Sequence, residues 1–277
     1  MVTFLKPMEN LGTKTIEQVA EGILSTLKSR FKILAYHSVG NASHDTYEVS
    51  TDNFEKQMRF LVKNDYSVIP LEDAYRNMLN QKIHERTIVI TFDDGIAKLK
   101  KFAFPILKDL NFPATIFLPV KYIGGIDIFS YEKPKADRVL LNWTSIEKSI
   151  DDGISYGSHT MSHPNLVILD KHTLDYELNE SRMILKERLG LRFHALAYPF
   201  GMFDNRVKTA ARQSGYDCAL CFGNVISNTK DTDPFEMKRE GIINTISLRD
   251  FARLVDIRND FSRGAKELMR GALKRKH

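Results

Sequence analysis

The sequence predicts an α/β fold in which parallel β-strands are joined by crossover helices. Short β-branched runs alternate with helical patterns from Lys32 onward, and chemically distinctive residues follow several of the predicted strand ends. The 277-residue chain is longer than most single domains, yet barrels of repeated strand and helix units reach this length undivided. No internal repeat or domain boundary interrupts residues 32–257, so we expect one sheet or barrel covered by helices.

The apolar runs predict seven strands. They cover residues 33–36, 66–69, 87–92, 114–118, 154–157, 195–198 and 218–220. Helices are expected between them at residues 52–63, 71–79, 98–110, 144–151, 170–189 and 205–214. The longest helix carries a stripe of leucines, and Gly190 is placed to end it. The irregular stretch 121–142 either lies over a binding cleft or is a tolerated insertion.

The two ends of the chain differ from this central region. Residues 1–31 are expected to form an amphipathic helical extension, because Ile16, Ala20, Ile23 and Leu27 repeat at helical spacing. Packing on the core is its expected role, with membrane contact as the second option. Residues 258–277 form a basic helix or tail with apolar residues at helical spacing. This tail either caps the barrel or makes peripheral contact with an anionic membrane surface.

Charge and composition exclude several classes of protein. Residues 258–277 contain seven Lys or Arg and two acidic residues, a net charge of +5 that equals the excess of the whole chain. The neutral body argues against nucleic-acid binding, which needs a basic face. No N-terminal stretch resembles a secretion signal and no run approaches about 20 apolar residues, so a cytoplasmic location is expected. Cys218 and Cys221 are expected to be buried reduced thiols, because a zinc site would need a second ligand pair.

Three motifs follow three different predicted strand ends. The first is Asp93-Asp94-Gly95, which offers two adjacent carboxylates but also makes an ordinary turn, as residues 151–153 are expected to do. The second contains His159 and His163, whose spacing can place two imidazole nitrogens on one ion. Asp94 is the natural third ligand of such a site.

The third motif is residues 196–201, Leu-Ala-Tyr-Pro-Phe-Gly. A rigid proline and a permissive glycine can fix backbone N–H groups toward a cavity, although a structural turn is the better explanation of this motif when it is taken alone. Turn chemistry does not easily explain all three motifs together, because they lie on three strand ends of one strand–helix repeat.

With these motifs the sequence resembles the polysaccharide deacetylase, or NodB-homology, family over residues 32–257. Segments 33–39, 112–117, 141–143 and 233–235 occur in the order seen in members with an opening Tyr-His segment. The resemblance implies an irregular (β/α)7-type barrel, and it identifies residues 32–257 as the catalytic domain. It further implies metal-dependent removal of N-acetyl groups from a sugar in a polysaccharide, oligosaccharide or lipid-linked glycan.

The family pattern also implies roles for single residues. Asp93 would be the catalytic base, while Asp94, His159 and His163 would hold a divalent metal, with zinc preferred over nickel, cobalt or iron. The backbone N–H of Phe200 would stabilise the oxyanion. Substrate contacts are expected from Tyr198, Pro199, Phe200 and Trp143.

Two departures from the family pattern leave roles to fill. Ala197 stands where many members carry an arginine that orients the base, and Arg239 is the candidate to replace that charge. The late histidine that protonates the departing amine is also missing, so His37 is the preferred general acid and His194 the second choice.

The missing arginine and the missing late histidine leave two alternative functions open. The same metal site could hydrolyse a small amide or cyclic imide, or the chain could be a sugar-binding scaffold that has lost turnover. The sequence does not indicate the oligomeric state.

Overall fold

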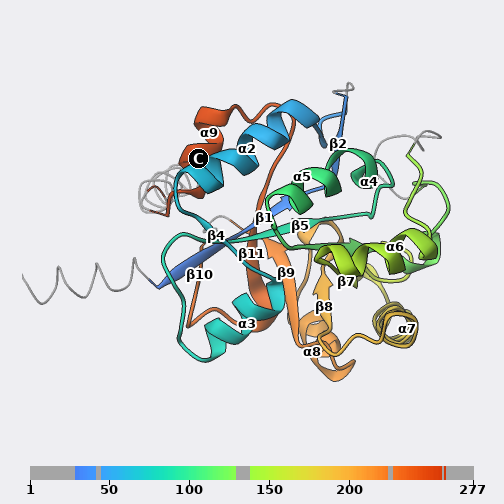
Figure 1. Ribbon diagram of the computed structural model, residues 1–277. Coiled ribbons are helices and arrows are strands. Elements are labelled where there is room, and N and C mark those ends of the chain that lie inside the picture. The colour runs from blue at the N-terminus through green and yellow to red at the C-terminus, as the bar shows by residue number, and fades with distance from the viewer. Residues whose placement is uncertain (1–28, 42–44, 129–137, 224–226, 258, 260–277) are drawn as a thin grey trace, which may run out of the picture.

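The computed structural model describes residues 29–41, 45–128, 138–223, 227–257 and 259 (Figure 1). Seven parallel strands close into a barrel in the order β1-β11-β9-β8-β7-β6-β5, and β5 pairs back to β1. Their bounds are β1 Arg30–Tyr36, β5 Thr87–Phe92, β6 Ala114–Leu118, β7 Ile154–Ser158, β8 Ala195–Ala197, β9 Cys218–Phe222 and β11 Met237–Gly241. The irregular (β/α)7 barrel implied by the family resemblance is therefore confirmed.

The predicted set of strands needs two corrections. The predicted strand 66–69 is reduced to β4 (Ser67–Val68), which pairs only with the start of β5 and lies outside the closed ring. The ring is completed by β11, which was not among the seven predicted strands. Its sequence, Met-Lys-Arg-Glu-Gly, lacks an apolar run because it carries Arg239 and Glu240, which are buried. An apolar pattern could not have revealed this strand.

Short strands extend the barrel at its edges. β10 (Ser227–Thr229) is antiparallel to the start of β1, and β2 (Ser38–Gly40) pairs with β3 (Glu48–Ser50) in a separate two-stranded sheet. The 3-10 helices are η1 Val120–Tyr122, η2 Ile150–Asp152, η3 Leu166–Ile168, η4 Pro199–Gly201 and η5 Pro234–Glu236.

Helices surround the strands much as predicted. They are α2 Thr51–Lys63, α3 Leu71–Leu79, α4 Leu99–Phe102, α5 Phe104–Asp109, α6 Trp143–Ser149, α7 Lys171–Leu189, α8 Asn205–Gln213 and α9 Leu248–Val255. The predicted helix 98–110 is split into α4 and α5 at Ala103, with Pro105 in the first turn of α5. The short helix α9, which was not predicted, lies beside α2 (Figure 1). Phe251 of α9 packs against Phe60 of α2.

The longest helix illustrates how the sequence sets its ends. At the start of α7 the side chain of Asp170 accepts a hydrogen bond from Thr173 N at 3.0 Å. At its end Gly190 adopts φ 63°, a left-handed conformation that glycine reaches without strain. The predicted stop at Gly190 is confirmed.

Alternate residues of the strands face two different cores. One face joins the apolar cluster inside the barrel, for example Ile33, Val89 and Phe117, whereas neighbours such as Leu34 and Ile90 pack against the outer helices. From α3, the side chains of Leu71, Ala74 and Met78 join the interior cluster. Cys218 and Cys221 lie in different clusters as free, buried thiols, which confirms the expectation of two reduced cysteines.

The expectations for the two chain ends fall almost wholly outside the described residues. This applies to the helical extension 1–31 and to the basic tail 258–277. Within the described part of the chain, no helix combines the length and apolar character needed to cross a bilayer.

Candidate active site

The two adjacent aspartates lie just beyond the carboxyl end of β5. The backbone N–H of Asp93 continues the strand by donating to Tyr36 O at 2.9 Å, and the chain then turns sharply with φ 68° at Asp94 and 66° at Gly95. A Cβ atom at Gly95 would lie 2.5 Å from Leu118 Cδ2, so this contact and the positive φ together favour glycine at this position. Both carboxylates are buried, which is costly for a charged group without partners.

The two histidines come from the loop that follows β7. His159 N donates to Leu118 O at 2.8 Å, and His163 N donates to Thr160 Oγ1 at 3.0 Å. Thr160 and His163 have φ angles of 67° and 59°, so the chain coils tightly between the two rings. Ser162 fixes this loop to α7 by donating from its N and Oγ atoms to Glu177 at 2.9 and 2.5 Å.

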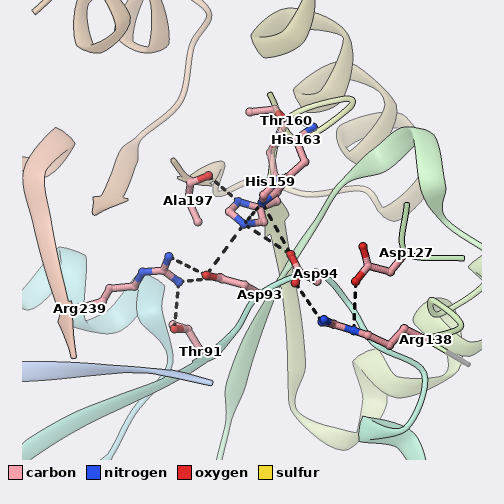
Figure 2. Close-up of polar contacts among 11 residues, drawn as sticks. Thr91, Asp93, Asp94, Asp127, Arg138, His159, Thr160, His163, Ala197 and Arg239 are labelled. Atoms are coloured by element: carbon pink, nitrogen blue, oxygen red, sulfur yellow. Dashed lines mark hydrogen bonds and ion pairs between the residues drawn. The ribbon is translucent and has the colours of Figure 1, made fainter. Parts of the chain in front are cut away.

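Asp94, His159 and His163 form a compact triangle of potential metal ligands (Figure 2). The two Nε2 atoms are 3.2 Å apart, and each lies 3.8 Å from Asp94 Oδ1. Donor atoms about 2.1 Å from a tetrahedral zinc ion would be roughly 3.4 Å apart, so the triangle fits a divalent ion of this kind. His159 Nδ1 lies 2.7 Å from Ala197 O, and a proton on Nδ1 would leave Nε2 free to bind the ion.

Burial sets the protonation states of these ligands. It lowers the pKa of His159 and of His163 to about 4, so both rings are neutral near pH 7, as metal binding requires. Burial also raises the pKa of Asp94 above its ordinary value. A nearby divalent cation would favour the charged carboxylate, because opposite charges at short range stabilise each other.

Asp93 has a different environment from its neighbour. Arg239 Nη1 and Nη2 donate to its two carboxylate oxygens at 2.6 and 2.8 Å, in a bidentate pair reached from the barrel interior. The guanidinium also lies over the rings of Phe117 and Phe222, at 5.5 and 4.8 Å from their centroids. Burial alone would raise the pKa of Asp93, but the charge of Arg239, joined at low pH by that of protonated His159, holds it well below its ordinary range. Asp93 is therefore a carboxylate throughout the neutral pH range.

A second buried arginine, Arg138, contacts the other aspartate. Its Nη2 lies 3.4 Å from Asp94 Oδ2, while its Nη1 and Nε lie 3.6 and 3.1 Å from carboxylate oxygens of Asp45 and Asp127. Figure 2 shows Arg239 and Arg138 on opposite sides of the aspartate pair. Arg138, Asp45 and Asp127 were not among the residues predicted from the sequence. The only signal was that Asp127 and Arg138 belong to the irregular stretch 121–142, which follows a strand end.

A cavity of about 510 Å³ opens over these groups. Its volume is within the range of sites for small molecules. One part of its lining is polar and contains the aspartates and histidines, whereas the other part is largely apolar. The lining residues are Ala35, His37, Tyr47, Asp93, Asp94, Arg138, His159, His163, Phe200, Met202, Phe222, Gly241, Ile242 and Ile243.

His37 and Phe200 both reach this cavity. The ring of His37 is half-buried beside Tyr47, with centroids 4.8 Å apart, and its Nδ1 has no hydrogen-bond partner among the described residues. Phe200 has φ 60° and packs its ring edge-on against His163 at 4.6 Å. The left-handed backbone at Phe200 is uncommon for a residue with a side chain and marks a locally strained turn.

Other predicted site residues lie elsewhere. Tyr198 is fully buried, stacks on Phe203 and donates to Phe235 O at 3.2 Å. Trp143 begins α6 and lies beneath Arg188. Neither these two residues nor Pro199 line the cavity as the described residues form it. His194 precedes β8 and therefore lies at the opposite end of the barrel from the aspartates.

Comparisons with known proteins point to one family. The family model described as polysaccharide deacetylase matches residues 80–219. The YxkH protein of Bacillus subtilis (strain 168) is 29% identical over 193 residues, which cover 69% of this chain and 64% of that protein. A poly-beta-1,6-N-acetyl-D-glucosamine N-deacetylase of Staphylococcus aureus (strain MRSA252) is 26% identical over 195 residues, which cover 67% of this chain and 65% of that enzyme. The chain thus spans less than two thirds of the length of these relatives.

Solved structures support the same architecture. BC0361, a polysaccharide deacetylase from Bacillus cereus, has a TM-score of 0.69 and 25% identity, with coverage of 82% of this chain and 69% of that chain. The Streptococcus pyogenes deacetylase PplD, in complex with acetate, has a TM-score of 0.71 and 21% identity, with coverage of 82% and 98%. The second likeness, at this lower identity, concerns the fold alone.

Proposed function

The chain belongs to the polysaccharide deacetylase family, and we propose that it is a metal-dependent hydrolase that removes N-acetyl groups from an N-acetylated glycan. The observation that carries the proposal is the ligand triangle of Asp94, His159 and His163 beside the arginine-bound carboxylate of Asp93. Amide hydrolysis needs a polarised carbonyl and a deprotonated water. A metal ion in the ligand triangle would meet the first need, and the Asp93 carboxylate would meet the second.

Asp94, His159 and His163 would hold the ion, with zinc the preferred metal. Two imidazoles and one carboxylate form a ligand set typical of catalytic zinc, although nickel, cobalt or iron can occupy similar sites. When bound, such an ion polarises the amide carbonyl and makes a water molecule more acidic. The neutral imidazoles supply lone pairs without first losing a proton.

Asp93 would accept the proton of the attacking water. Its low pKa makes it a weak base, so its contribution must come from position rather than from basicity. Arg239 would provide that position, because a bidentate pair fixes both the plane and the direction of the carboxylate. This arrangement would fill the role of the charge that is missing at Ala197.

The backbone N–H of Phe200 would stabilise the oxyanion. The rigid Pro199 and the left-handed conformation at Phe200 fix the direction of this peptide group before the substrate arrives. His37 would protonate the departing amine, because it lines the cavity that contains both aspartates. His194 is no longer a candidate, since it lies at the other end of the barrel.

The charges around the cavity favour a neutral sugar over a small anionic amide. A convergent arginine would have favoured the anion, but Arg138 is already paired with three carboxylates and Arg239 with Asp93. The S. aureus relative is named for a polymer of N-acetyl-D-glucosamine, which is a neutral substrate. We therefore propose an N-acetylhexosamine polymer or oligomer as substrate, with a lipid-linked glycan as a variant.

Peripheral membrane contact through residues 258–277 is a separate proposal that rests on their charge. Deletion of the residues after Arg258 should reduce partitioning to vesicles that contain anionic lipid. Unchanged partitioning would refute the contact and leave the catalytic proposal intact.

Acetate release from oligomers of β-1,6-linked N-acetyl-D-glucosamine by zinc-loaded protein tests the main proposal. Asp93→Asn should lower the rate by about 10²–10⁴-fold. Asp151→Asn is the matched control, because Asp151 belongs to a second Asp-Asp-Gly turn that is exposed and lies outside the cavity. Zinc binding without acetate release by the native protein would favour the sugar-binding scaffold instead.

A further inference from the structure

Arg138 connects three carboxylates that come from separate parts of the chain. Asp45 precedes β3, Asp94 follows β5, and Asp127 lies in the segment between β6 and α6. All four side chains are buried, and Asp127 is completely so. An arginine in such a position has little freedom to move, since each of its three guanidinium nitrogens lies within 3.6 Å of a carboxylate oxygen.

The two oxygens of Asp94 face different partners. Oδ1 lies 3.8 Å from Nε2 of each histidine, whereas Oδ2 lies 3.4 Å from Nη2 of Arg138 (Figure 2). The carboxylate plane is thereby set by groups on both of its sides. This matters at Asp94 because its left-handed backbone is a strained conformation that neighbouring contacts must maintain.

We infer that Arg138 is a positioning residue of the metal site. It holds Oδ2 of Asp94 so that Oδ1 points at the imidazole nitrogens, and Asp45 and Asp127 hold Arg138 in turn. This inference rests on the proposed function only in that Asp94, His159 and His163 bind a divalent ion. It adds that the ion's affinity depends on three residues outside the ligand set.

Residues that hydrogen-bond to a metal ligand commonly orient that ligand and so contribute to metal affinity. Loss of such an outer contact typically costs about 10–100-fold in metal affinity. The contact of Arg138 with Asp94 is longer than either hydrogen bond of Arg239 with Asp93, so it leaves more electron density on Asp94 for a metal. An arginine that bound both oxygens of Asp94 would compete with the ion.

The test measures zinc affinity by competition with a chelator, independently of turnover. Arg138→Met should weaken zinc binding by about 10–100-fold and alter the absorption spectrum of the cobalt-substituted protein. Arg206→Met is the control, because Arg206 also fixes a loop, donating to three backbone carbonyls at 2.8, 3.3 and 2.8 Å, but outside the site. Its zinc affinity and cobalt spectrum should match those of the native protein.

A second variant covers the case in which Arg138→Met does not fold. Asp127→Asn keeps the arginine but weakens its anchor, so it should give a smaller loss of affinity in the same direction. Native zinc affinity in folded Arg138→Met, or in Asp127→Asn when the first variant is unfolded, would overturn the inference and leave the proposed function standing. Failure of the native protein to bind zinc, nickel, cobalt or iron would overturn both.

Discussion

Replacing Arg239 with methionine should destabilise the protein and slow it at the same time. The change removes both hydrogen bonds, of 2.6 and 2.8 Å, that Asp93 receives from Arg239, and leaves a carboxylate buried inside the barrel. Removing one partner of a buried ion pair costs about 3–5 kcal/mol. For a domain of this size that loss corresponds to a fall in Tm of roughly 6–20 °C.

The stability lost in Arg239→Met should depend on pH, because Arg239 lowers the pKa of Asp93. In the native protein the pKa of Asp93 lies below its unfolded value, so the pair stabilises the fold above pH 3.8, and this contribution is lost as the pH falls through the folded pKa. Without Arg239, burial becomes the dominant influence and raises the pKa of Asp93. The Tm difference between native and variant protein should therefore shrink as the pH falls, because Asp93 then takes up a proton.

A double-mutant cycle distinguishes loss of the Arg239–Asp93 ion pair from simple loss of packing. Thermal unfolding of Arg239→Met, Asp93→Asn and the double variant gives the coupling energy of the pair. The double variant should be more stable than Arg239→Met, since it no longer buries an unpaired charge. A double variant that is no more stable would refute the argument. Arg239→Lys should recover part of the stability but little of the rate, because an ammonium cannot form the bidentate pair.

Three further outcomes follow from the same site. His37→Asn should lower kcat by about 10²–10⁴-fold, with zinc affinity unchanged. An unchanged kcat would remove His37 as the general acid. The metal-free protein should lose stability as the pH falls from 6.5 to about 4, because His159 and His163 take up protons in the unfolded chain but not in the folded protein. A Tm that stays constant over this pH range would contradict this expectation. Gly95→Ala should cost about 1–3 kcal/mol or more, and it should cost more than Gly153→Ala, because both glycines have positive φ but only Gly95 is also crowded by Leu118. Equal losses of unfolding free energy in the two variants would show that the Leu118 side chain moves aside without cost.

The sequence allowed prediction of those parts of the fold and site that depend on local pattern. The strands 87–92 and 114–118 have the predicted bounds because each is a continuous apolar or β-branched run, bounded by charged residues in the first case and by prolines in the second. The strand β11 could not be predicted in this way, because a residue such as Arg239 is buried only when Asp93 meets it from another strand.

The same limit applies to the residues around the metal ligands. Asp94, His159 and His163 belong to short motifs, and the histidine spacing already suggested one ion. Arg138 and Asp127 belong to no motif, and their roles depend on a long-range meeting of three loops. Pairing between charges that are distant in sequence is fixed by the fold, so a single sequence gives no means of choosing the partners.

The two arginines also offer a physical reason why neighbouring aspartates should differ in role. Arg239 occupies both oxygens of Asp93 from inside the barrel, so this carboxylate stays ionised but offers few lone pairs to a metal. Arg138 touches one oxygen of Asp94 and shares its charge with two other carboxylates, so the second oxygen stays directed at the histidines. The surrounding charges therefore lower the pKa of one aspartate while burial raises that of the other. This division, rather than their order in the chain, makes Asp93 the candidate base and Asp94 the candidate ligand.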